Sequence, residues 1–526
     1  MLSTTRTIAL AALACAAAGC STPVPQVLKP AELPAKFEGP VAPGSSIWPN
    51  PDWWKSFGSD EMSGLIVTAQ TDNLNIAEAM ANVLEARANV TIQRAALFPD
   101  ITASPSAQRS RSPAASAQCL TIPSSLRSTC SSFTYNQFGL VGSASWTPDI
   151  WGLAQDNLRA AQEALKSSRF AQQDVALTEV ATVADTYFDI LALREEITTT
   201  ENNIKAANNI LTITKAQVTN GVASQLDLSQ QEATVEGQIA ALPPLREQER
   251  EARFALAVLL GRPPEGFDVK AQNMNTIKSP AVAPGLPSVL LERRPDVAEA
   301  EANLAQAHAN VDAARAAFFP AVTLTSDAGF AGTAISTLLH GTSFEWSIGA
   351  SALQTVFDGG KLLGESDLEK ATQQNMIATY RLTVISAFQG VEDSLGQVSN
   401  YADEQAALEK EVAASADAFR ISELQYREGI VALLTVLQAQ QTLFAAEDQL
   451  ITTKLSHLQA EVGLYEALGG GWVENPKDAT QKTTTTGQPL LTAAPAAPAN
   501  TDTSVPASTP SAPATPSASP SQPTKS

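Results

Sequence analysis

The chain has 526 residues, 44% of them apolar, and it carries 54 acidic against 34 basic side chains, a net charge of −20. This balance argues against nucleic acid as a partner, because binding to phosphates needs an excess of Lys and Arg. The length allows two or three ordinary domains. The acidity either serves solubility alone or gives a surface or lumen that disfavours anions.

Residues 1–19 predict a sorting signal. The apolar stretch 8–18 is too short to span a bilayer. The small residues before Cys20 resemble the lipobox of bacterial lipoproteins, in which that cysteine is acylated and begins the mature chain; an ordinary secretory signal, or use of Cys15, is the alternative. Ser21 in place of Asp favours passage to the outer membrane. We therefore expect a covalent lipid on Cys20, which anchors without spanning, and no other cofactor.

Two segments differ from the rest in composition. Residues 20–60 are rich in Pro and Gly and predict an extended, lipidated N-terminal segment. Residues 474–526 consist mostly of Thr, Ser, Pro and Ala, a composition that cannot bury enough surface to fold, and predict a disordered tail. In the mature chain Cys119 and Cys130 are the other cysteines. In an oxidising compartment they could form a disulfide, and metal binding is the less favoured alternative.

Long helices should form most of the remaining chain. Helical periodicity runs through six segments, at about 61–97, 152–219, 222–260, 291–318, 360–427 and 432–468. Two of them, 152–219 and 360–427, contain no proline, and each would give a helix of about 100 Å. Such lengths exceed those of a compact globular domain.

The apolar residues of the last two helices follow a seven-residue repeat. One series is Val384, Phe388, Val391, Leu395, Val398 and Ala402, and the other is Leu437, Phe444, Ile451, Leu455, Leu458, Val462 and Tyr465. The repeat predicts a coiled-coil seam. A solid helical bundle would fit this pattern equally well.

Four segments of about ten residues alternate apolar and polar side chains, near 100–110, 133–147, 321–330 and 343–353. In the last one Phe344, Trp346 and Ile348 alternate with Glu345 and Ser347. This pattern is typical of membrane β-strands with one face toward lipid, although a soluble sheet would look similar. Four strands cannot close a membrane barrel, whose smallest single-chain form has eight, so several chains would have to share one.

The sequence also contains an internal repeat. Residues 77–99 and 298–320 are identical at 14 of 23 positions, and both end in Phe-Pro. The repeat predicts two equivalent halves, each with a helix–strand–strand–helix order.

Catalysis finds no support in the sequence. The three histidines, His308, His340 and His457, lie in different segments, and no Gly-rich phosphate loop or Cys/His metal spacing occurs. We expect neither an enzyme nor a metal site.

Four motifs resemble those of the outer-membrane factors of tripartite efflux pumps, the TolC-like channels, and within them the NodT-type lipoproteins of RND efflux. The motifs are Leu291–Val297 (LERRPDV), Leu259–Pro264 (LLGRPP), Phe357–Gly360 (FDGG) and Leu464–Trp472 (LYEALGGGW). The resemblance covers about residues 40–473. It implies a mainly α-helical fold with a membrane β-barrel, in which each chain gives four strands to a trimeric 12-stranded barrel that continues into a long periplasmic α-helical barrel. The resulting domains are a first repeat at 61–260, an equatorial linker at 261–290 and a second repeat at 291–473.

The resemblance also implies a periplasmic tip. Gly221 and Gly429 should end the long helices in two hairpin turns. By position, three residues match polar links that hold the tip closed in the family: Tyr426, Asp227 and Lys454. Thr435 and Gln438 stand where the family can have an acidic ring, which argues against a strong cation-blocking constriction here. Ordinary helix-surface polarity is the alternative for the link residues.

The function implied is a passive outer-membrane exit duct for small molecules such as drugs or toxic compounds. It would work as a homotrimer in the outer membrane of a Gram-negative bacterium, with a periplasmic adaptor protein and an inner-membrane RND-type transporter. Two alternatives remain open: a non-conducting lipoprotein scaffold that bridges envelope layers, and the exit duct of type I protein secretion.

Overall fold

The computed structural model describes residues 37–39, 49–112, 132–280, 293–470 and 472. All of them belong to the first of the two units into which the chain divides, Met1–Glu474. The predicted signal 1–19, the lipidation site Cys20, the pair Cys119 and Cys130, and the tail 474–526 lie outside the described residues.

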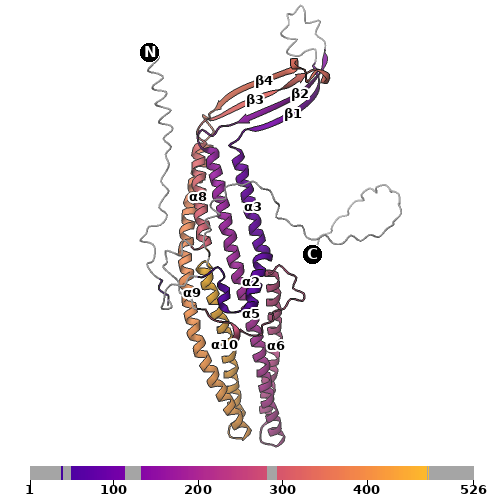
Figure 1. The fold of residues 1–526 in the computed structure, drawn as a ribbon. Helices are drawn as coiled ribbons and strands as arrows, with labels where there is room; N and C mark the ends of the chain where they lie inside the picture. Colours follow the sequence, from indigo (N-terminus) through magenta and orange to yellow (C-terminus); the bar gives the residue numbers. More distant parts are fainter. Residues whose placement is uncertain (1–36, 40–48, 113–131, 281–292, 471, 473–526) are drawn as a thin grey trace, which may run out of the picture. The chain divides into compact units, whose positions relative to one another are not determined.

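Seven α-helices form most of the described chain (Figure 1). They are α2 (Asp60–Asp72), α3 (Leu74–Ala95), α5 (Leu153–Thr219), α6 (Gln225–Leu259), α8 (Pro295–Ala316), α9 (Lys361–Arg427) and α10 (Leu433–Ala467). Short 3-10 turns occur at η2 (Trp53–Phe57), η4 (Met274–Thr276), η5 (Ile335–Thr337) and η6 (Gly341–Ser343). Helices α5 and α9 have 67 residues each, α6 and α10 have 35 each, and α3 and α8 have 22 each. A duplicated unit would give such matched lengths.

Four antiparallel strands form one sheet in the order β1-β2-β3-β4. They are β1 (Asp100–Ser112), β2 (Phe133–Trp146), β3 (Ala321–Gly332) and β4 (Phe344–Leu353). The predicted strand at each of the four places is confirmed. The alternation of apolar and polar side chains along each segment was sufficient to predict these strands, because successive side chains of a strand point to opposite faces of the sheet.

The helix expected at 61–97 is two helices, and that prediction was wrong at Asn73. The Asn73 backbone is extended (ψ 130°), and its side-chain oxygen accepts hydrogen bonds from the backbone N–H groups of Asn75 and Ile76. Its side-chain nitrogen donates to Glu179 and to the carbonyl of Leu259. Asn73 therefore ends α2 and caps α3, since an Asn side chain satisfies the orphan donors of a helix start.

The helices pack side by side in one layer rather than in a solid bundle. Beside the sheet, α3 packs on α5, α5 on α8, and α8 on α9. Toward the opposite end, α6 packs on α5, α5 on α10, and α10 on α9. Helices α5 and α9 run through both regions, so each of them carries one half of the layer.

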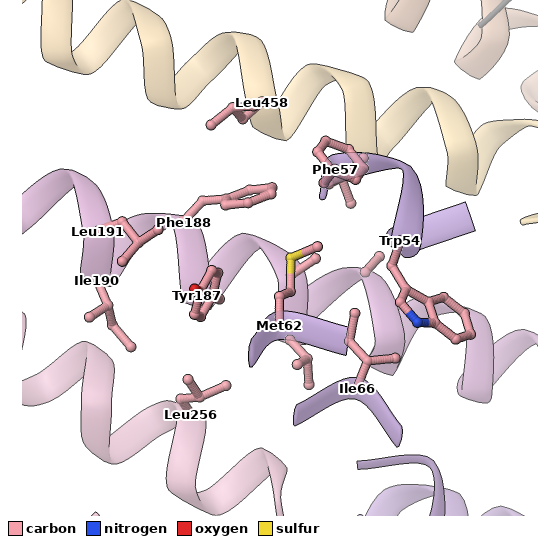
Figure 2. Close-up of a cluster of buried hydrophobic side chains, with 14 of the residues drawn as sticks. Trp54, Phe57, Met62, Ile66, Tyr187, Phe188, Ile190, Leu191, Leu256 and Leu458 are labelled. Carbon is pink, nitrogen blue, oxygen red and sulfur yellow. The ribbon is translucent and has the colours of Figure 1, made fainter. Parts of the chain in front are cut away.

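The largest buried cluster lies where α2, α5 and α10 meet (Figure 2). Phe57, Met62, Ile66 and Phe188 are fully buried there, and Trp53 stacks on Tyr465 with ring centroids 4.8 Å apart. The seam predicted on α10 contributes Ile451, Leu458 and Val462 to the same cluster. Each fully buried large side chain stabilises the fold by roughly 1.5–3 kcal/mol.

Charged side chains hold the segment after α6 against this cluster. Arg194 on α5 pairs with Glu249 at 2.9 Å and with Asp268 at 2.6 Å, and it donates to the carbonyls of Val269 and Ala271. Because Arg194 is largely buried and all these partners are hydrogen-bonded, the segment is fixed to the α5–α6 pair.

Gly261, in the LLGRPP motif, permits a close approach of two backbones. Its φ is +64°, and a Cβ at this position would lie 2.2 Å from the carbonyl oxygen of Asp72. Gly266 also has a positive φ, +77°, but a Cβ there would meet nothing within 4 Å.

We predict that Gly266→Ala lowers the free energy of unfolding by about 1 kcal/mol, from backbone strain alone. Gly261→Ala should lower the free energy of unfolding by roughly 1–3 kcal/mol more, because the Asp72 carbonyl must move. Thermal unfolding followed by far-UV circular dichroism measures both. Equal losses in the two variants would contradict the close approach.

Candidate functional site

The strand register sorts the side chains of the sheet onto two faces. One transverse row consists of Ile101, Ala144, Ser326 and Ile348, and the next consists of Ala103, Gly142, Ala328 and Trp346. The two rows are two positions apart along every strand, so their side chains lie on the same face of the sheet. Trp346 and Ile348 are 68% and 75% exposed, so this apolar face is open in the single chain.

The opposite face is polar. Its rows include Thr102, Ser143, Asp327 and Ser347, which lie opposite one another across the sheet. The Ser347 hydroxyl donates to Asp327 at 3.1 Å. A sheet with one apolar and one hydrated face suits a boundary between lipid and water.

The sheet has two open edges. Among the described residues, the strand order is β1-β2-β3-β4, and the outer strands β1 and β4 each pair with one neighbour. The N–H and C=O groups on their outer sides can pair with a further strand, because an unpaired strand edge is a template for further pairing.

The far ends of the two long hairpins carry equivalent turns. Gly221 and Gly429 have φ values of 72° and 73°, and both turns are closed by a hydrogen bond of 2.8 Å, from Val222 N to Gln217 O and from Ile430 N to Gln425 O. This is the Schellman arrangement, in which glycine adopts the left-handed conformation that ends a helix. The two predicted turns are where the sequence placed them.

Tyr426 joins the two hairpins at this tip. Its side chain is 4% exposed, and its hydroxyl lies 3.1 Å from the Thr214 hydroxyl on α5. Its backbone carbonyl accepts a second bond from the Gln217 amide at 3.0 Å. Burial raises the pKa of Tyr426, the Thr214 hydrogen bond opposes that shift, and the charge of Asp227 adds to it. The phenol is therefore a neutral hydrogen-bonding group.

Asp227 does not pair with Tyr426 within the chain. Its carboxylate accepts from the Ser224 backbone N–H at 2.9 Å and from the Ser224 hydroxyl at 2.8 Å, while the Asp227 N–H donates back to that hydroxyl. This capping box fixes the start of α6. Sequence reasoning missed Thr214 and Gln217, and no motif marks them, because their role arises from the packing of α5 against α9 and α10.

Lys454 does not lie at the tip, and its placement there was wrong. It follows Leu433, the first residue of α10, by 21 positions, about 32 Å of helix. Its ammonium lies 3.8 Å from Glu195, which also accepts from the Met274 backbone N–H. Lys454 therefore belongs to the middle of the layer, beside the segment after α6.

The two residues proposed for the narrowing ring, Thr435 and Gln438, lie on the first two turns of α10 and are exposed. They are therefore available at the tip surface. Their neighbours Val436 and Leu437 are buried in the tip cluster with Phe419 and Phe444. The exposed pair thus faces away from the α9–α10 seam.

Buried carboxyl groups gather in the middle of the layer. Burial raises the pKa of Glu461 to about 7, although its hydrogen bond from Ser279 opposes the shift. Burial also raises the pKa of Asp185 to about 7, and the nearby Asp189 and Glu466 add to it. His457 lies 3.7 Å from Glu461, and burial lowers its pKa. At neutral pH the carboxyl groups of Glu461 and Asp185 are therefore about half protonated, and burial favours the neutral form of His457.

In the described ranges, no three His, Cys, Asp or Glu side chains come together in a way that could bind a metal ion. Among the helices of those ranges, none combines the length and the apolar character needed to cross a membrane.

Comparison with known proteins agrees with this geometry. The family model described as "Outer membrane efflux protein" matches residues 65–262 and 286–470. The chain is 35% identical to the pyoverdine export outer membrane protein OpmQ of Pseudomonas putida, over 89% of this chain and 98% of that one. It is 33% identical to the toluene efflux pump outer membrane protein TtgC of Pseudomonas putida, over 90% and 97%. It superposes with a TM-score of 0.74 on the open state of the Neisseria gonorrhoeae MtrE outer membrane channel, at 27% identity, over 86% and 98%.

The two-faced, open-edged sheet and the layer of long helices define the class of outer-membrane channel proteins. Within this class, the chain belongs to the outer membrane efflux protein family. The sequence-based recognition of the family, its mixed α and β fold, its efflux function and its outer-membrane location is confirmed.

We predict that Tyr426→Phe loosens the contact between the two hairpins, since it removes the hydroxyl bond to Thr214 while it keeps the aromatic ring. The loss should be about 1 kcal/mol, and protease cleavage of the tip should become faster. Thr212→Val is the matched control, because the exposed Thr212 hydroxyl bonds only the Asn208 carbonyl of its own helix. Cleavage at the wild-type rate in Tyr426→Phe would contradict the link.

We predict a pH dependence of stability from Glu461. Its raised pKa means that the folded chain holds this proton more tightly than the unfolded chain does. The contribution of Glu461 to stability should therefore be fully present below about pH 4.5 and should fall by up to about 1.4 kcal/mol per pH unit as the pH rises toward 7. Glu461→Gln should reduce this slope in thermal unfolding, whereas Glu411→Gln, at an exposed position of α9, should leave it unchanged.

Proposed function

We propose that three copies of this chain form one passive exit duct for small organic molecules. The twelve strands would close a barrel in the outer membrane, the long helices would continue it into the periplasm, and lipid on Cys20 would anchor each copy. A periplasmic adaptor would dock on the tip, and an inner-membrane RND-type transporter would supply the energy.

The open edges of the sheet carry this proposal. A strand edge cannot remain unpaired in lipid, because no water is present to satisfy its N–H and C=O groups. Four strands are too few to close on themselves, and eight give a barrel filled by side chains. Three chains give twelve strands, enough for an open lumen, with β4 of one copy pairing with β1 of the next.

The two halves of the chain differ in how far neighbouring helices cover them, and this difference supports the same assembly. Helix α8 packs between α5 and α9, whereas its repeat equivalent α3 packs mainly on α5. Ile92 on α3 is 66% exposed, whereas its equivalent Ala313 on α8 is 6% exposed. A neighbouring α9 placed against α3 and α6 would complete the first half as α5 completes the second.

The relatives suggest the class of cargo. Two of them are described as exporting pyoverdine and toluene, which are small organic molecules rather than proteins. We therefore favour small-molecule efflux over type I protein secretion. The cargo would be selected mainly by the partner transporter, because the duct contributes a hydrated path.

The protein purified in mild detergent should have the mass of three chains by light scattering, and it should form ion-conducting pores in planar lipid bilayers. A monomer, or a trimer that never conducts, would reject the duct in favour of a non-conducting scaffold.

A matched pair of variants on β4 tests the orientation of the sheet. We predict that Ile348→Arg reduces the yield of membrane-inserted trimer, since an arginine facing lipid near the midplane costs about 2–4 kcal/mol. Ser347→Arg, one residue away on the polar face and beside Asp327, should insert normally and change the single-channel conductance. Equal insertion of both variants would contradict the assignment of faces.

A further inference from the structure

The strands contain five charged residues, and the register sorts them by sign between the two faces of the sheet. The acidic ones lie on the polar face; they are Asp100, Asp327 and Glu345. The basic ones, Arg109 and Arg111, lie on the apolar face, because they follow Ile101 along β1 by an even number of positions and side chains alternate along a strand. The apolar face of an acidic chain thus carries an isolated pair of positive charges.

Both arginines are exposed and lack an acidic partner among the described residues. The Arg111 guanidinium donates to the Ser132 hydroxyl at 3.0 Å. Asn136 lies directly opposite Arg109 on β2, so its amide is on the same face. Two positions along a strand cover about 7 Å, which lets both guanidinium groups reach one ligand. The remaining N–H groups suit an anion that accepts several hydrogen bonds.

The parts of the chain next to this corner of the sheet bring no acidic residue to it. Strand β2 contains no Asp or Glu, and neither do the connecting segments 113–131 and 333–343. In the proposed assembly β4 of the next copy would pair with β1, and its acidic residue, Glu345, lies on the polar face. A ligand of opposite charge would therefore complete the corner.

Arg109 and Arg111 lie at the end of β1 that is remote from the helices, since β1 begins just after α3. From Ile101 the strand covers about 27 Å to Arg109 and about 34 Å to Arg111. With the tilt of membrane strands, about 35–45°, these lengths give heights of about 19–22 Å and 24–28 Å. The apolar band of a membrane barrel is about 25 Å tall, so both side chains reach the headgroup level, where a lipid-facing arginine costs little.

We propose that Arg109 and Arg111, together with Ser132 and Asn136, bind the phosphate of an anionic lipid in the outer leaflet of the membrane. This rests on the proposed function, which places the sheet in the outer membrane and the helices on its periplasmic side. The planar guanidinium groups pair with phosphate through two parallel hydrogen bonds each. Phe138, two residues from Asn136 on the same face, would contact the acyl chains. A lipid phosphate therefore fits both the charge and the apolar surface below it, whereas free phosphate fits only the charge.

Diphosphorylated lipid A is the probe, titrated into the delipidated trimer in mild detergent and counted by native mass spectrometry. Arg109→Gln together with Arg111→Gln should weaken its binding at least tenfold, because the phosphate loses its charged donors. The matched control adds Gln108→Arg and Ser110→Arg to this double variant, which restores the net charge on the polar face of the same strand. Binding should stay weak in this control. Zwitterionic phosphatidylcholine should bind the wild type and both variants equally.

Wild-type affinity for lipid A in the double glutamine variant would overturn the site. Recovery of binding in the control would overturn it too, because net charge rather than position on the apolar face would then govern binding. Displacement of lipid A by inorganic phosphate at equal concentration would reject the lipid as the ligand. If the double variant yields no trimer, Arg109→Gln and Arg111→Gln are titrated singly, and each should weaken binding about threefold, whereas unchanged binding in both would overturn the site.

Trimer mass and single-channel conductance are measured on the same preparations. A wild-type protein that is monomeric or never conducts rejects the duct. A conducting wild-type trimer that binds lipid A no better than phosphatidylcholine rejects the lipid site alone.

Discussion

The unpaired edges of a four-stranded sheet are the constraint on which the rest of this protein depends. Backbone hydrogen bonds must be satisfied inside a membrane, and one chain cannot satisfy those of β1 and β4 by itself. The helical layer has a similar deficit in side chains, because Ile92 on α3 and Phe254 on α6 are exposed, whereas the residues at the equivalent positions of the other half, Ala313 and Val462, are buried. In the proposed assembly, a neighbouring copy would satisfy the backbone groups of β1 and would cover the side chains of α3 and α6 at the same edge.

The sequence was informative where one-dimensional periodicity decides the structure. Alternation located all four strands, and long proline-free runs located α5 and α9 to within one residue at either end. The break at Asn73 was missed because no Pro or Gly marks it. Its effect depends on Glu179 and on the Leu259 carbonyl, which no local pattern places beside it.

The candidate site was predicted less well, since its partners come from different hairpins. Tyr426 was expected to be a link residue with Asp227 as its partner, but its hydroxyl contacts Thr214 in the chain, and Asp227 caps its own helix. Lys454 matched a family position, yet it pairs with Glu195 in the middle of the layer. Motif position places a residue along a helix, whereas its partner depends on how the neighbouring helix is rotated and shifted.

Duplication explains how a folded chain can leave one of its helix-packing surfaces uncovered. The matched lengths of α5 and α9 and of α6 and α10 mean that each half can pack against the other in the same way. Inside the chain this packing is used once, where α5 covers α8 and α10. The equivalent surface of α9 has no equivalent of α3 and α6 within the described chain. An interface that one half already forms with the other can be repeated between copies without new chemistry, and the proposed assembly requires no more than this.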